Sequence, residues 1–155
     1  MIQRIQSLYL AIIIILSLLL LSGGILNFTD GAGNTLKLSS AGILTDQNQK
    51  IVSQVFAAWP LTLAEVLIIL ISLVAVLMFR NRKKQMYLTL LLIIMSAVII
   101  AVITWFGFKT LHDLNMNLRP GIKMALPVLI LVFSILAFRG IQKDDQLVKS
   151  YDRLR

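Results

Sequence analysis

Residues 85–108, QMYLTLLLIIMSAVIIAVITWFGF, contain no charged side chain and consist mainly of Leu, Ile, Val and Ala. A helix rises about 1.5 Å per residue and the hydrocarbon core of a bilayer is about 30 Å thick, so roughly 20 apolar residues span it. This run has that length, and a helix on the surface of a soluble protein would need a polar face that it lacks. The stretch therefore predicts a transmembrane helix.

Three further uncharged runs occupy residues 5–29, 66–79 and 124–138. The second run reaches spanning length only with residues 61–65, and the last only with residues 121–123. Lys123 and Arg139 can lie along the ends of that last helix and place their charges among the headgroups. We therefore expect an all-α membrane protein with four transmembrane helices. Their expected bounds are about 3–22, 60–79, 84–108 and 121–139.

The composition favours one small domain, residues 1–155, with no separate catalytic domain. The chain has 155 residues, 58% of them hydrophobic, which leaves no room for a soluble catalytic domain. It has no cysteine, which excludes disulfides, thiolate metal sites and covalent haem attachment. His112 is the one histidine, and no histidine and carboxylate cluster has metal-ligand spacing. We expect no catalytic residues, no metal and no cofactor.

The positive charges predict an orientation. The net charge is +8, and Lys and Arg gather beside the apolar runs rather than on one soluble face, which argues against nucleic acid as a partner. With the N-terminus inside, the cytoplasmic segments carry more Lys and Arg than the outer loops, so both termini are expected in the cytoplasm. We interpret residues 3–22 as a retained helix and not as a cleaved signal peptide, because the apolar run continues through Leu26.

The expected outer loop, residues 23–59, contains a hairpin pattern. Alternating residues at 25–29 and 35–38 flank the glycine-rich stretch 30–34, which indicates a β-hairpin. An isolated hairpin is marginal in water, so it should pack on the outer helix ends or on another chain. Residues 46–53 show a weak pattern for a short helix.

Glu65 is the one acid close to an apolar run, and an ionisable residue at membrane depth is a functional hypothesis by default. It lies roughly 7–8 Å along the axis from Pro60, so we expect it to approach the outer headgroups. A negative charge near a helix N-terminus is also favourable. Two interpretations stay open: a structural role with Lys123 or Arg119, or a functional role in either binding or proton transfer.

Two other sets of polar residues have simpler structural interpretations. The basic cluster between the second and third helices is expected to contact anionic lipid and set orientation. Its members are Arg80, Arg82, Lys83 and Lys84. The hydroxyls at helical depth, with Ala97 and Ala101 at a spacing of four, are interpreted as helix-packing residues. The hydroxyl residues are Ser17, Ser72, Ser96, Thr104 and Ser134.

The last sixteen residues, 140–155, predict a short amphipathic helix on the cytoplasmic side. A helix this short is marginal alone, so it should dock either on its own bundle and lipid or on a partner subunit. The candidate partner contacts are Leu147, Tyr151, Arg153, Leu154 and Arg155.

Both ends of the chain resemble a known family. Residues 1–10, MIQRIQSLYL, look like its start, and residues 139–145, RGIQKDD, with 147–155, LVKSYDRLR, look like its ending. The family is one of unknown function, made of small four-helix inner-membrane proteins from Bacteroidota. The resemblance implies a multi-pass protein of a bacterial inner membrane and supplies no activity and no site residues.

Polar residues are scarce in the predicted membrane helices, and the two soluble segments are suited to contact with other proteins. We therefore expect a non-enzymatic accessory or scaffold subunit of a larger inner-membrane complex. Its expected partners are membrane lipid and other membrane-protein subunits, with no small-molecule substrate identified. The alternative is a small oligomeric transporter or lipid-binding protein with an outer-leaflet cleft near Glu65, lined also by Lys123 and Arg119. A membrane enzyme is the third class, and we find no nucleophile, base or metal set for it.

Overall fold

The computed structural model describes residues 3–29, 35–39, 42–45, 59–79, 81–114, 117–119 and 121–153. That part of the chain contains four α-helices, one 3-10 turn and four short strands. The helices are α1 (Gln3–Leu21), α2 (Trp59–Leu77), α3 (Arg82–Leu114) and α4 (Leu126–Arg153), with the 3-10 turn η1 (Ile122–Ala125) directly before α4. The strands are β1 (Gly24–Thr29), β2 (Thr35–Ser39), β3 (Gly42–Thr45) and β4 (Asn117–Arg119). The short helix expected at 46–53 lies outside the described residues.

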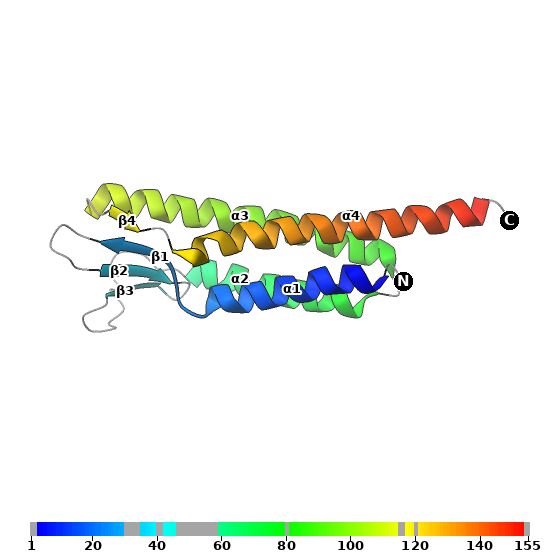
Figure 1. The fold of residues 1–155 in the computed structure, drawn as a ribbon, viewed down its shortest axis with the longest axis horizontal. Coiled ribbons are helices and arrows are strands. Elements are labelled where there is room, and N and C mark those ends of the chain that lie inside the picture. Colours follow the sequence, from blue (N-terminus) through cyan, green and yellow to red (C-terminus); the bar gives the residue numbers. More distant parts are fainter. Residues whose placement is uncertain are drawn as a thin grey trace.

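The four helices form an elongated up-and-down bundle with the sheet at one end (Figure 1). α1 packs against α2 and α4, and α3 packs against the same two helices, so α1 and α3 stand at opposite corners. We call the two ends of the bundle the sheet end and the turn end, the latter holding the α2–α3 turn and the start of α1. The short turn between α2 and α3 favours antiparallel packing of these two helices.

Each helix turns one stripe of residues inward at alternating steps of three and four. This spacing is that of helices packed side by side at a small crossing angle. In α1 the buried residues are Gln6, Leu10, Ile13, Ser17 and Leu20; in α2 they are Leu61, Glu65, Ile68, Ser72 and Ala75. In α3 they are Gln85, Thr89, Leu92, Ser96, Ile99 and Ile103; in α4 they are Pro127, Ile130, Ser134, Ala137 and Ile141.

The outward faces of the bundle are also apolar. Leu18, Leu70, Ile94 and Val132 are exposed, as are many other large apolar residues of all four helices. An exposed apolar surface of this extent marks a protein whose surroundings are apolar. Three segments are long and apolar enough to cross a membrane: Pro60–Leu77, Arg82–Phe108 and Ile122–Val148. α1 supplies a shorter apolar stretch, Ile5–Leu21.

Side chains complete the tight turn between α2 and α3. The last carbonyls of a helix have no partner within it. The side-chain Nε2 of Gln85 donates to the Ala75 carbonyl oxygen over 3.1 Å and so satisfies one of them inside the bundle. At the start of α3, Asn81 Oδ1 accepts from the Lys84 backbone N–H at 3.5 Å, as an N-cap residue does.

The sheet contains the expected hairpin and two further strands. β1 and β2 pair antiparallel, with Asn27 opposite Lys37 and Phe28 opposite Leu36, as the alternating pattern predicted. The order is β3-β2-β1-β4, so β4 joins β1 from the connection between α3 and α4. Part of the connection between α3 and α4 therefore belongs to the sheet, which the sequence did not indicate.

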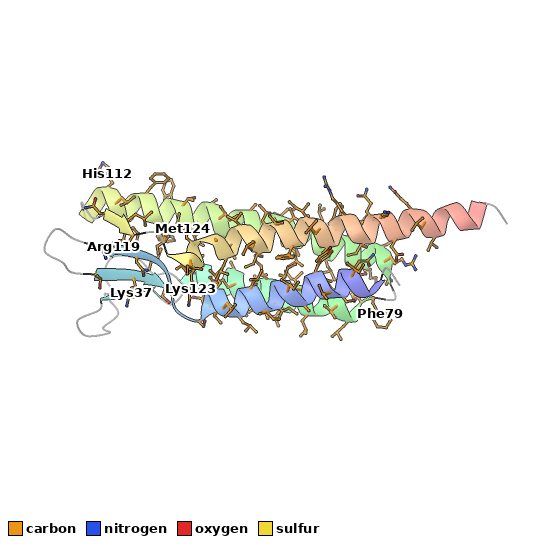
Figure 2. All side chains as sticks on the ribbon, in the orientation of Figure 1. Lys37, Phe79, His112, Arg119, Lys123 and Met124 are labelled. Atoms are coloured by element: carbon orange, nitrogen blue, oxygen red, sulfur yellow. The ribbon has the colours of Figure 1, made fainter. Side chains whose placement is uncertain are left out.

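One face of the sheet is apolar and the other polar, because side chains alternate along each strand. Leu26, Phe28 and Leu38 are buried on the apolar face. The polar face aligns Lys37, Asn27 and Arg119 across three neighbouring strands. Gly107 of α3 approaches the apolar face closely, since a Cβ built there would lie 3.3 Å from Leu26 Cδ1. Figure 2 shows the cationic side chains Lys37, Arg119 and Lys123 at the sheet end.

α4 does not end where its apolar run ends. We expected a helix to Arg139 and a separate amphipathic helix after it, and that prediction is wrong: α4 is one continuous helix through Arg153. It passes the turn end and projects beyond the other helices (Figure 1). Residues 140–145 still pack on the bundle, since Ile141 is buried. We call residues 146–153 the arm.

Candidate functional site

Glu65 lies in the interior of the bundle. Its side chain is only 1% exposed, and within the described residues neither carboxyl oxygen has a hydrogen-bond partner. On the inward stripe of α2, Glu65 lies between Leu61 and Ile68, which are both buried. Glu65 therefore faces the interior of the bundle and not its surface, because the α2 stripe directs it inward.

Of the two cations expected beside Glu65, Lys123 is bonded elsewhere and Arg119 is exposed. Lys123 Nζ donates to the Ser22 carbonyl oxygen over 2.7 Å, which joins the segment before α4 to the end of α1. Arg119 lies on β4, exposed, on the polar face of the sheet. Within the described residues, the Glu65 carboxyl forms no hydrogen bond with either of these two residues.

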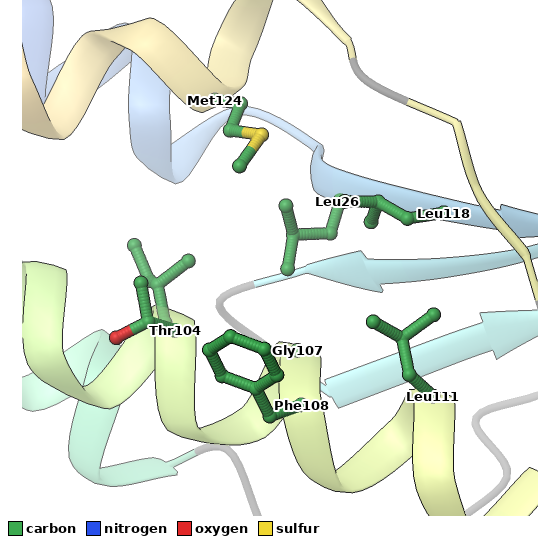
Figure 3. Close-up of a pocket in the computed structure, with 8 residues that line it drawn as sticks. Leu26, Thr104, Gly107, Phe108, Leu111, Leu118 and Met124 are labelled. Carbon is green, nitrogen blue, oxygen red and sulfur yellow. The ribbon is translucent and has the colours of Figure 1, made fainter.

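An apolar groove does lie at the sheet end, between α3 and the start of α4. A pocket of about 140 Å³ is enclosed by α3, Leu26, Leu118 and Met124, as Figure 3 shows. A second pocket of about 90 Å³ shares Ile103, Thr104 and Met124 with it and continues toward Pro127 and Val128. We call the two together the outer groove. Sequence patterns did not indicate it, because its residues come from α3, from β1 and β4, and from the segment that begins α4.

Thr104 is the polar side chain of the outer groove, and its hydroxyl is already used. Thr104 Oγ1 donates within α3 to the Ile100 and Ala101 carbonyl oxygens, at 2.9 Å each. What the groove offers to a ligand is therefore methyl, methylene and aromatic surface. Phe108 and Val128 are exposed at its sides, so it opens toward the surroundings of the bundle.

Five other hydroxyls of the helices face inward. Ser72, Thr89, Ser96 and Ser134 are buried and donate to carbonyl oxygens three or four residues earlier in their own helices. Ser17 is buried too, and its Oγ has no hydrogen-bond partner within the described residues. The packing interpretation holds for the buried serines.

The small residues Ala97 and Ala101 do not pack inside the bundle as expected. Both are exposed on α3, beside Val98 and Trp105, on the face turned away from the other helices. Their spacing of four therefore brings no helix of this chain close to α3.

The basic cluster is resolved in part. Arg82 Nε lies 3.5 Å from Asp144 Oδ2, and Arg82 Nη1 donates to the Asp144 carbonyl oxygen at 3.4 Å, so the start of α3 is tied to α4 just before the arm. Lys83 and Lys84 are exposed and remain candidates for contact with lipid headgroups. Arg80 lies outside the described residues.

The arm presents apolar side chains where no other helix covers it. Leu147 is 39% and Val148 40% exposed. Of the other residues predicted to contact a partner, Tyr151 and Arg153 lie on α4 but their side chains are outside the described set, as are Leu154 and Arg155 altogether. The arm is thus extended from the bundle and not folded back onto it.

A search of the described residues finds no group of three or more His, Cys, Asp or Glu that could hold a metal ion. His112 is exposed near the end of α3, at the sheet end (Figure 2).

Comparison with known proteins identifies one family. The family model described as Domain of unknown function (DUF4293) matches residues 2–154, so the match takes in every helix and strand and the arm. The resemblance to a family of unknown function, drawn from the two ends of the chain, is confirmed. No curated protein and no solved structure matches the chain.

Proposed function

The chain belongs to the DUF4293 family, and we propose that it is a non-enzymatic accessory subunit of a larger complex in a bacterial inner membrane. In this proposal all four helices cross the membrane, with the sheet outside and the turn end, the arm and both termini in the cytoplasm. The excess of Lys and Arg at the turn end supports this orientation.

The arm is the observation that carries the proposal. A helix that leaves its bundle has no tertiary packing to stabilise it, and short helices are marginal in water. The arm nevertheless continues α4 without a break, with Leu147 and Val148 exposed. The pair Arg82–Asp144 holds α4 in direction at the base of the arm. A helix held outward with apolar side chains exposed fits a partner with an apolar groove at the cytoplasmic surface.

Photocrosslinking from the arm tests the proposal. A photoreactive amino acid at position 148, in the full chain in native membranes, should give one discrete adduct with another membrane protein. The matched control is position 98, since Val98 is similarly exposed but faces the apolar surroundings of α3, and should give lipid adducts. The same protein should co-purify in constant ratio in mild detergent, and the double variant L147K/V148K should lose it. Lipid adducts alone from position 148 would contradict the proposal.

The outer groove favours a second candidate function, the binding of a lipid chain. The groove is lined almost wholly by apolar side chains and opens where α3 and α4 meet their surroundings. An acyl chain from the outer leaflet satisfies such a surface without any polar partner. Lys123, next to Met124 in the chain, would lie near the headgroup at the sheet end.

Native mass spectrometry of the detergent-purified chain tests this second function. Thr104→Phe fills the groove and should remove retained lipid, whereas Ala101→Phe adds the same ring to the exposed face of α3, outside both pockets, and should leave retained lipid unchanged. Equal lipid retention in wild type and both variants would exclude the groove as the binding site.

A further inference from the structure

The buried polar side chains of the four helices lie at the level of Glu65 and between it and the turn end, interspersed with apolar ones. The buried residues of the four inward stripes can be grouped by their height along the bundle axis, and we call each such height a level. We take the level at the turn end as the lowest. There Gln85 donates to the Ala75 carbonyl oxygen, and a Cβ built on Gly140 would lie 3.1 Å from Gln6 Cγ. The ion pair between Arg82 and Asp144 links the start of α3 to the same part of α4, so Gln6, Ala75, Gln85 and the last buried residue of α4, Ile141, share that level.

Glu65 lies about 15 Å above this level, at a rise of about 1.5 Å per residue. Ser17 of α1 and Ser96 of α3 lie about 16 Å above it by the same measure, so the three share a level across neighbouring helices. Among the described residues Glu65 is the one buried acidic or basic side chain. From α4 the residue at this level is Ile130.

Every level between Glu65 and the turn end contains a buried polar side chain. Ser134 comes next below Glu65, Ser72 with Thr89 follow, and Gln6 with Gln85 complete the series at the turn end. We call these residues, with Ser17 and Ser96, the polar column. Within the part of the chain that the structure describes, buried groups without a hydrogen-bond partner lie at both ends of this column. They are Gln6 Nε2 at the turn end, and Ser17 Oγ with both Glu65 oxygens at the other end.

Toward the sheet end, the described buried residues of the four inward stripes are all apolar. The next level holds Leu20, Leu61, Ile99 and Pro127, and Ile103 follows. Beyond them Ile25, Leu26 and Phe28 of β1 close the end of the bundle. A proton or water crosses such apolar layers only at the cost of losing its hydrogen bonds.

We propose that Glu65 is a proton-binding site inside the membrane that exchanges protons with the turn end alone, through the polar column. In the binding step a carboxylate oxygen of Glu65 forms an O–H bond with a proton released by water at the turn end, and the hydroxide left behind is neutralised by buffer there. The hydroxyls of Ser134, Ser72 and Thr89 have lone pairs free of their intrahelical donor bonds, and these can accept from a proton-carrying water. This assignment stands apart from the accessory function, since it uses neither the arm nor a partner.

Infrared spectroscopy tests the proposal with one isotope label. Glu65 is the one glutamate in the chain, so protein grown with carboxyl-13C glutamate has a single isotope-shifted carboxyl band, which Glu65→Gln removes. The full chain is reconstituted in one orientation in vesicles, and the band is followed after a pH jump on either side. The protonated and ionised bands should interconvert after a jump on the turn-end side and stay unchanged after a jump on the sheet side.

Two variants test the polar column itself. Thr89→Val with Ser134→Ala removes hydroxyls at two levels and should abolish the response to the turn-end jump. The matched control is Thr104→Val, which removes a hydroxyl from the outer face of α3 and should keep the response. A wild-type band that responds from the sheet side, or from neither side, overturns the proposal, and that measurement stands even where the double variant does not fold. Equal loss in Thr104→Val would also overturn it.

Discussion

Lys123 Nζ donates a 2.7 Å hydrogen bond to the carbonyl oxygen of Ser22, one residue past the end of α1. The bond links two corners of the bundle at the sheet end and satisfies a carbonyl that the helix leaves open. Lys123→Met keeps the length of the side chain and removes the donor. It should lower the free energy of unfolding by about 1 kcal/mol, measured by titration with denaturing detergent.

The control for this change is Lys143→Met, which removes the same charge from an exposed position on α4. It should leave the unfolding free energy unchanged. An equal loss in both variants would mean that net charge, and not the bond to Ser22, is responsible.

Gln85 is expected to matter more than Lys123, because its bond to Ala75 is buried. Gln85→Leu leaves the Ala75 carbonyl without a partner in the interior and should cost about 1–3 kcal/mol of unfolding free energy. Gln142→Leu makes the same change at an exposed position and serves as the control. A Gln85→Leu protein as stable as wild type would show that the bond is unimportant.

For the substitution Glu65→Leu we expect no loss of stability. Its carboxyl has no hydrogen-bond partner among the described residues, so Glu65→Leu removes no bond and a costly buried polar group. The unfolding free energy should stay level or rise. Ile68→Ala, one step along the same stripe, creates a cavity and should cost about 2–5 kcal/mol. Strong destabilisation by Glu65→Leu would indicate that the carboxyl holds the bundle together.

The ion pair between Arg82 and Asp144 should contribute little to overall stability. Both side chains are partly exposed, so a double-mutant cycle with Arg82→Gln and Asp144→Asn should give a coupling of about 0.2–1 kcal/mol. The coupling should shrink in high salt if the pair lies outside the hydrocarbon, as the proposed orientation requires. A coupling insensitive to salt would place the pair away from water.

The helices and the hairpin were predictable from local patterns. Uncharged runs of spanning length identify the helices, and alternation around a glycine-rich stretch identifies β1 and β2. β4 was missed because Asn117, Leu118 and Arg119 are too few to show a period, and they form a strand only through pairing with β1. α4 was ended too early because a change from apolar to charged residues marks a change of surroundings, whereas residues 140–153 keep their helical preference.

The setting of Glu65 was only half predictable. Its residue type and depth identified it as a candidate, but helices that are apolar all round do not reveal which face turns inward. The spacing of Leu61, Glu65 and Ile68 identifies the inward face of α2 only once the positions of the neighbouring helices are known. The outer groove was unpredictable for the same reason, since it is formed by segments distant in the chain.

The orientation of the bundle can be measured directly, because the chain has no cysteine and single cysteines can be introduced cleanly. Asn117→Cys on β4 and Gln146→Cys at the base of the arm are both exposed positions at opposite ends of the molecule. In intact spheroplasts, a membrane-impermeant thiol reagent should label Asn117→Cys at once and Gln146→Cys only after the membrane is opened. Labelling of Gln146→Cys in sealed spheroplasts would place the arm outside the cell and contradict its role as a cytoplasmic contact for a partner subunit.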